Sequence, residues 1–197
     1  TRVREDQAFL RDNGTDSTPK GLLQWALDAS PSRIVQASQT VSLANVTTDL
    51  GKLILKLVEQ NVPMLRPGWI MSPRTWNYLM TVLTTNGPYA FRDEMTRGTL
   101  WGWPFRTTTQ IPNNLDTSGT GGADESDIYL VDFADVVIGD SDMLRIDASG
   151  EASYEEGGSV KSAFHRDETV VRGITEHDIA VRRDESVGIL RDVSWGA

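Results

Sequence analysis

The sequence predicts a protein of the α+β class, and three stretches carry that prediction. Apolar residues recur at helical spacing over residues 47–61, and a short apolar run at 68–71 leads directly into a capped helix. From residue 164 onward the chain alternates in the manner of strands. With 197 residues, the chain is long enough for one large domain or two small lobes with a core of their own.

The first forty residues contain short elements separated by turn formers. Residues 1–12 predict a helical piece that ends at Asn13 and Gly14, which accept the left-handed conformation found after helices. The apolar run at 22–30 is short, and residues 32–43 fit either an extended segment or a loop.

Residues 47–61 predict a helix. Thr47 or Thr48 can cap its start, and Pro63 ends it. The apolar side chains that share one face of this helix are Leu50, Leu53, Ile54, Leu57 and Val58.

A strand, a capped turn and an amphipathic helix follow in direct succession. Residues 68–71 read as a short buried strand, Ser72 as an N-cap and Pro73 as the first helical residue, where a missing N–H costs nothing. The helix is expected to continue to about residue 85, with Trp76, Leu79, Met80 and Leu83 on one face. Since no G-x-S-x-G surrounds Ser72, we interpret this serine as a cap and not as a nucleophile.

Strands dominate the rest of the chain. Expected strands span 104–108, 127–132 and 135–139, and the polar loop 116–126 precedes the second of these. After an acidic, glycine-punctuated stretch at 140–158, alternation over 170–179 predicts a long strand, and residues 186–193 predict the last one.

Composition excludes several classes of protein. The chain has no cysteine, so disulfides and thiolate metal sites are excluded, and no apolar run is long enough for a membrane span. Its net charge is −9 and it has only four lysines, so it lacks the clustered cations that bind nucleic acid phosphates. Because residue 1 is not Met and no signal peptide follows, we expect the chain to be cut from a longer protein.

No arrangement of residues predicts a catalytic, metal or cofactor site. The two histidines are His165 and His177, and a strand would point His177 away from Glu176 and Asp178. The glycines of SGTGGAD match neither a dinucleotide fingerprint nor a P-loop. Two acidic pairs, Glu155–Glu156 and Asp124–Glu125, leave glycoside hydrolysis as a weak alternative. The tryptophans fit packing in the core and at interfaces better than an aromatic surface that binds carbohydrate. There are six of them: Trp25, Trp69, Trp76, Trp101, Trp103 and Trp195.

The order of several motifs is similar to that of a known family. WIMSPRTWNYL is followed by GPYAFRDEMTRGTLWGWPFRTTTQIP, DIYLVDFADVVIGDSDMLRID, FHRDETVVRG and AVRRDESVGILRDVSW, and EDQAFLRDNGTDSTPKGLL precedes them. From Glu5 to Trp195 this series resembles the major capsid proteins of tailed bacteriophages, which have the Hong Kong ninety-seven fold.

The resemblance implies two lobes. An axial domain over 32–139, with a central sheet flanked by helices, would be completed by the last strand, within 181–197. Residues 1–31, as the end of a spine helix with its loop, and the long strands of 140–180 would form the peripheral lobe. The N-terminal arm and the extended loop of the family would precede Thr1. A family cross-link joins a lysine to an asparagine; Asp167 stands at the matching position, so we expect no covalent cross-link.

The function implied is that of a structural shell subunit and not of an enzyme. Its partners would be copies of itself, in pentamers and hexamers that enclose DNA without reading its sequence, in the virion and, during assembly, in the host bacterial cytoplasm. No cofactor and no membrane are expected. Interfaces are enriched in aromatic residues and arginine, so we expect subunit contacts at Tyr89, Phe91, Arg92, Arg97, Trp101 and Trp103; purely internal packing of these rings is the alternative. An encapsulin-like shell is the alternative function, and a carbohydrate-active domain a more distant one.

Overall fold

The computed structural model describes residues 8–15, 18–119, 122–140 and 144–197 of the chain. These divide into two compact units, one with the bounds Ile138–Asp178 and the other with Thr1–Val137 and Ile179–Ala197. We call the larger one the sheet unit and the smaller one the ribbon unit.

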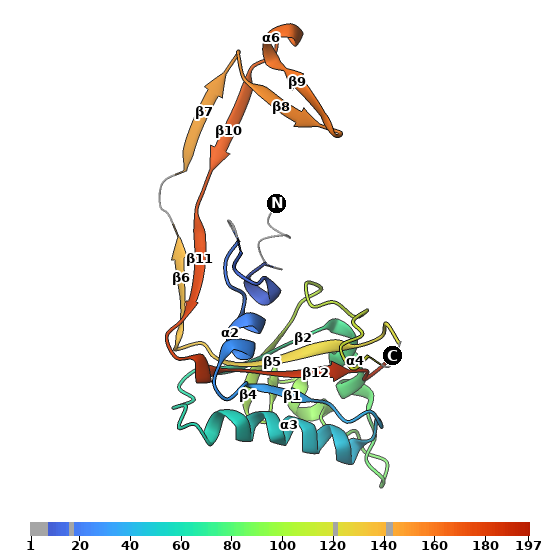
Figure 1. Ribbon diagram of the computed structural model, residues 1–197. Helices are drawn as coiled ribbons and strands as arrows, with labels where there is room; N and C mark the ends of the chain where they lie inside the picture. Colours follow the sequence, from blue (N-terminus) through green and yellow to red (C-terminus); the bar gives the residue numbers. More distant parts are fainter. Residues whose placement is uncertain (1–7, 16–17, 120–121, 141–143) are drawn as a thin grey trace. The chain divides into compact units, whose positions relative to one another are not determined.

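A six-stranded mixed sheet forms the centre of the sheet unit (Figure 1). Its order is β1-β12-β5-β2-β4-β3. The strands, in that order, are Ile34–Gln36, Val187–Val193, Ser126–Asp132, Pro67–Met71, Trp103–Thr107 and Thr99–Leu100. The central strand β5 is antiparallel to both of its neighbours, whereas β1 is parallel to β12 and β4 is parallel to β2.

Helices cover both faces of this sheet, α3 on one and α2 on the other (Figure 1). Alternate side chains of β5 point to opposite faces. Ile128 and Leu130 join the core under α3, while Tyr129 and Val131 join the core under α2. Every residue of β5 is therefore buried, and the mixed α+β class predicted from the sequence is confirmed.

The helix predicted at 47–61 is α3, which spans Leu43–Val58. It begins a turn earlier than predicted, because Ser42 and not Thr47 or Thr48 caps it by accepting from the Asn45 N–H. The two threonine hydroxyls instead donate to carbonyls one turn back in the helix.

The capped turn at Ser72 is confirmed. Its side chain accepts from the Thr75 N–H, and Pro73 opens helix α4, Pro73–Thr81. The helix ends before residue 85, because the chain turns extended at Val82 and a β-bridge joins Leu83 to Tyr89. Leu83 is consequently exposed and does not share the buried face predicted for it.

Two shorter stretches are now assigned. Residues 8–11 are helical, and the rest of the piece predicted at 1–12 lies mainly outside the described residues. The apolar run after Gly21 forms α2, Leu22–Asp28, which packs on β12. The assignment of residues 1–31 to a peripheral lobe stays a prediction.

The strand predicted at 170–179 is two strands with different partners. β10, Val170–Ile174, pairs with β7, Arg145–Ser149, whereas β11, His177–Val181, pairs with β6, Val136–Asp140. The two strands are separated by residues 175–176. The sequence pattern used to predict one strand runs through these two residues without interruption, so it did not predict the separation.

The ribbon unit contains two antiparallel pairs and a short helix. Beside β7–β10 it holds the hairpin of β8, Ser153–Glu156, and β9, Ser159–Ser162, followed by α6, Ala163–Arg166. Asp147 pairs with Arg145 and Arg172 on one side of β7–β10. Among the described residues, no helix of either unit is long and apolar enough to cross a bilayer.

Replacing Gly188 by Ala is expected to lower the free energy of unfolding of the sheet unit by about 1–3 kcal/mol. A Cβ at this position of β12 would overlap Leu57 Cδ1 and lie 3.0 Å from Leu53 Cδ1, both on buried side chains of α3. Urea unfolding followed by circular dichroism would measure the loss. Gly150→Ala is the control, because no atom lies within 4 Å of the added Cβ there; equal midpoints for the two variants would contradict the expectation.

Candidate subunit-contact surface

Tyr89 and Arg92 form the outer part of the predicted contact segment. The loop before Tyr89 is closed by its bridge to Leu83 and by the Thr84 N–H, which donates to the Pro88 carbonyl. The Arg92 guanidinium lies over the Tyr89 ring, 3.2 Å from its centroid, and its Nε donates to the Met80 carbonyl. Tyr89 is 43% exposed, so its ring is held in place while one side faces solvent.

Three other predicted residues pack inward. Phe91 is buried, and Trp101 and Trp103 are partly buried against the core that contains Trp69. The Trp103 and Trp69 rings lie 6.1 Å apart. Arg97 is exposed at the end of α5, Arg92–Met95. The structure thus places Tyr89 and Arg97 outward and the other aromatic rings mainly inward.

A groove beside Trp103 adds residues that the sequence did not single out. It has a volume of about 460 Å³ and lies wholly in the sheet unit. We call it the Phe133 groove, and its lining is Leu65, Arg66, Pro67, Gly68, Trp69, Trp103, Pro104, Arg106 and Phe133. The strands expected at 127–132 and 135–139 leave Phe133 in the connection between them, and nothing local predicts that the segment before β2 reaches it.

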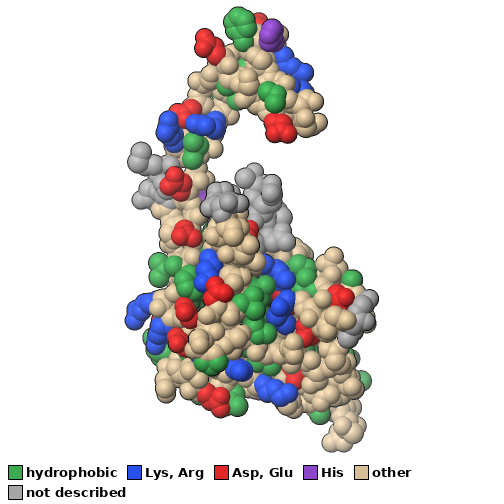
Figure 2. All heavy atoms as spheres, in the orientation of Figure 1, with side chains coloured by type: hydrophobic (Ala, Val, Ile, Leu, Met, Phe, Trp, Pro, Cys, Tyr) green, Lys and Arg blue, Asp and Glu red, His purple; other side chains and the backbone are tan. Residues whose placement is uncertain are grey.

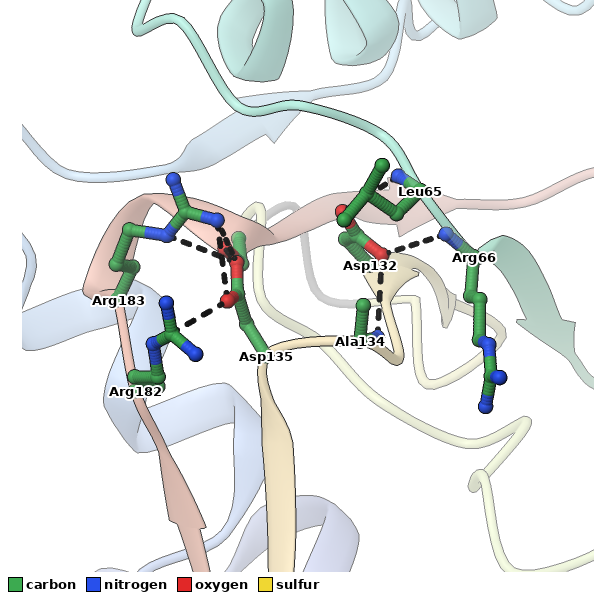
Figure 3. Close-up of polar contacts among 8 residues, drawn as sticks. Leu65, Arg66, Asp132, Ala134, Asp135, Arg182 and Arg183 are labelled. Atoms are coloured by element: carbon green, nitrogen blue, oxygen red, sulfur yellow. Dashed lines mark hydrogen bonds and ion pairs between the residues drawn. The ribbon is translucent and has the colours of Figure 1, made fainter.

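The Asp132 carboxylate joins two segments that contribute lining residues to this groove, and Figure 3 shows its hydrogen bonds. The carboxylate is fully buried and accepts from the Leu65 and Arg66 N–H groups, both at 2.9 Å, and from the Ala134 N–H at 3.1 Å. One side chain therefore fixes two segments distant in sequence, the one that enters β2 and the turn that carries Phe133.

Asp135 makes a second polar cluster close by in the sequence (Figure 3). It accepts from Arg183 Nε at 3.0 Å and from the Ser186 hydroxyl, and Arg182 lies 4.0 Å away. Burial raises the pKa of Asp135, but the hydrogen bonds from Ser186 and Arg183 and the arginine charges outweigh it, so the net pKa is lowered. The cluster ties the start of β6 to the segment after β11.

Glu125 and His177 make two further polar contacts. Glu125 is buried and accepts from the N–H and hydroxyl groups of Thr117 and Ser118, which closes the loop before β5. His177 pairs with Asp140 at 2.7 Å. In the described ranges no three His, Asp or Glu side chains are placed to hold a metal ion.

Charged side chains of both signs are interspersed over the visible face of the sheet unit (Figure 2). That face therefore shows no continuous basic surface of the kind that binds nucleic acid phosphates. It agrees with the acidic balance of the whole chain, 28 Asp and Glu against 19 Lys and Arg.

Comparison with known proteins decides the family. The model described as "Phage capsid family" matches residues 1–192. The chain belongs to the phage capsid family. A curated relative, the major capsid protein of Klebsiella oxytoca phage phiKO2, is 41% identical over 196 residues, which covers 94% of this chain and 42% of the relative. The chain thus spans less than half the length of this family member.

Solved structures share the fold of this chain. The capsid of an empty GTA particle has a TM-score of 0.66 at 15% identity, with 96% of this chain and 61% of that chain covered. A structure from Mycobacterium phage Adephagia has a TM-score of 0.60 at 16% identity and covers 95% and 60%. The SrpI encapsulin of Synechococcus elongatus PCC 7942 reaches 0.54 at 15% identity, covering 98% and 61%. The predicted Hong Kong ninety-seven fold is confirmed.

Proposed function

We propose that this chain is part of a structural subunit that self-assembles into the capsid of a tailed phage or prophage. The observation that carries the proposal is 41% identity to a major capsid protein over 196 residues. Copies of the subunit form pentamers and hexamers of an icosahedral shell, which assembles in the host cytoplasm and becomes the virion head. Residues 32–139 and the last strand, within 181–197, form the axial domain, and residues 1–31 with the strands of 140–180 form the peripheral lobe.

The shell encloses DNA without binding its sequence. The net charge of −9 and the mixed charges of the visible face support this part of the proposal, because tight binding to phosphates needs clustered Lys and Arg. No residue is assigned a catalytic role.

An encapsulin-like compartment is the second candidate. The likeness to the SrpI encapsulin supports it, but at 15% identity this likeness concerns the fold alone. A carbohydrate-active domain has less support, since Glu125 of the Asp124–Glu125 pair is buried and its carboxylate accepts hydrogen bonds from Thr117 and Ser118.

Expression of the full-length protein followed by electron microscopy tests the proposal. We expect closed shells, and particles with nucleic acid when the phage packaging proteins are present. Soluble monomers under all assembly conditions would contradict the capsid function. Shells that instead enclose a host enzyme would favour the encapsulin-like alternative.

Charge reversal at Arg97 is expected to reduce the number of shells formed by the full-length protein, because this exposed residue belongs to the proposed contact set. Arg97→Glu should lower particle counts several-fold, while Arg97→Lys, which keeps the charge, should not. Unchanged counts for Arg97→Glu would remove the contact role. Arg92 is less suitable for this test, because its stacking on Tyr89 also supports the local fold.

A further inference from the structure

The Phe133 groove exposes apolar surface that the sheet unit itself does not cover. Leu65 is 70% exposed and Phe133 is 43% exposed, although both belong to segments that Asp132 holds rigidly. Trp69 and Trp103 also line the groove. A rigid apolar groove needs little reorganisation to bind a partner, which favours affinity.

Two arginines border this apolar surface. Arg66 and Arg106 are both exposed lining residues of the groove. In the part of the chain that the structure describes, neither guanidinium makes an ion pair, whereas Arg183 and Arg11 are paired with buried carboxylates. An occupant that carries Asp or Glu beside an apolar side chain would therefore match the groove in charge and polarity.

A second copy of this chain has the required composition. Its net charge is −9, with 28 acidic against 19 basic residues, so a neighbouring copy carries carboxylates in excess. The groove is also continuous with the proposed contact segment, since Trp103 belongs to both. A contact between the groove of one copy and a different surface of the next is heterologous, the kind of contact that closes rings of subunits.

We infer that the Phe133 groove receives an acidic and partly apolar segment of a neighbouring copy in the assembled shell. Leu65 and Phe133 supply the apolar contact, and Arg66 and Arg106 pair with carboxylates of the incoming segment. This inference rests on the proposed function, since it names the surface through which shell subunits meet.

This chain has no cysteine, so once any cysteine elsewhere in the full-length protein is replaced by serine, single-cysteine labelling tests the inference directly. Leu65→Cys should react with a maleimide reagent in free subunits and about tenfold more slowly in shells, because a packed interface excludes water and reagent. Leu27→Cys on α2, a residue 40% exposed and outside the groove, serves as the matched control. If the Leu65→Cys protein does not assemble, Arg106→Cys at the border of the groove replaces it.

The outcomes separate this inference from the function on which it rests. If the thiol of the Leu65→Cys variant reacts as fast in shells as in free subunits, the inference is overturned and the capsid function still stands. Failure of the unaltered protein to form shells overturns both. Protection that arises only after another virion protein is added shows a different occupant and also overturns the inference.

A charge variant adds an independent readout. Arg106→Glu should lower shell yield several-fold and Arg106→Lys should keep it, with circular dichroism of the free subunit unchanged in both. An unchanged yield of shells for Arg106→Glu would overturn the proposed pairing of the groove arginines with carboxylates of the neighbouring copy.

Discussion

Replacing Trp69 by Ala is expected to lower the free energy of unfolding of the sheet unit by about 3–5 kcal/mol. The side chain is 1% exposed at the centre of β2, and it packs between the core under α3 and the ring of Trp103. Its Nε1–H donates to the Leu100 carbonyl at 2.9 Å, so the variant also leaves a buried acceptor unpaired.

Two further variants separate the causes of this loss. Trp69→Phe keeps most of the buried area and removes the hydrogen bond, and we expect a loss of about 1–3 kcal/mol. Trp76→Ala on α4 removes a partly exposed indole and should cost less than Trp69→Ala. Urea unfolding of the three variants measures the differences in free energy of unfolding. A destabilisation by Trp76→Ala as large as that by Trp69→Ala would contradict the central role of the Trp69 side chain in the core.

Replacing Asp135 by Asn is expected to destabilise the sheet unit by about 2–3 kcal/mol at neutral pH. The variant loses the buried carboxylate charge that pairs with Arg183 and accepts from the Ser186 hydroxyl. The ion pair itself contributes less than a fully buried one would, because Arg183 is partly exposed. Exposed Asp184, in the same connection between β11 and β12, provides the control through Asp184→Asn.

The effect of Asp135 should depend on pH in a defined direction. The folded state lowers the pKa of Asp135, so its contribution is complete above the unfolded pKa of about 3.9 and is lost as pH falls through the folded pKa. The stability difference between the unaltered protein and Asp135→Asn should therefore stay constant from pH 7 to about pH 4 and shrink on further acidification. A difference that grows on acidification would show that another group is responsible.

Local chemistry determined which elements the sequence could predict. Ser72 and Pro73 belong together as cap and first helical residue, so the start of α4 was predicted to the residue. The start of α3 was missed because Thr47 and Thr48 look like caps, while the hydroxyl that actually caps the helix is that of Ser42. The break between β10 and β11 was missed because the alternation of side chains does not report a change of partner strand.

The features of the candidate contact surface could be predicted only in part. Aromatic residues and arginines indicated the segment from Tyr89 to Trp103, but composition did not separate the rings that pack inward from those that face solvent. The Phe133 groove was not predicted, because it depends on Asp132 joining the turn after β5 to the chain before β2. Such a contact between distant segments leaves no periodic signal in either one.

The position of β12 has a consequence for synthesis on the ribosome. This strand lies between β1 and β5, and Ile34 finds its partner only when Ile189 is available at the far end of the chain. A nascent polypeptide that lacks β12 leaves β1 without a partner and uncovers one edge of β5. The ribosome must therefore pass Val193 before the sheet can close, and a chain that has not yet reached β12 has no completed sheet unit.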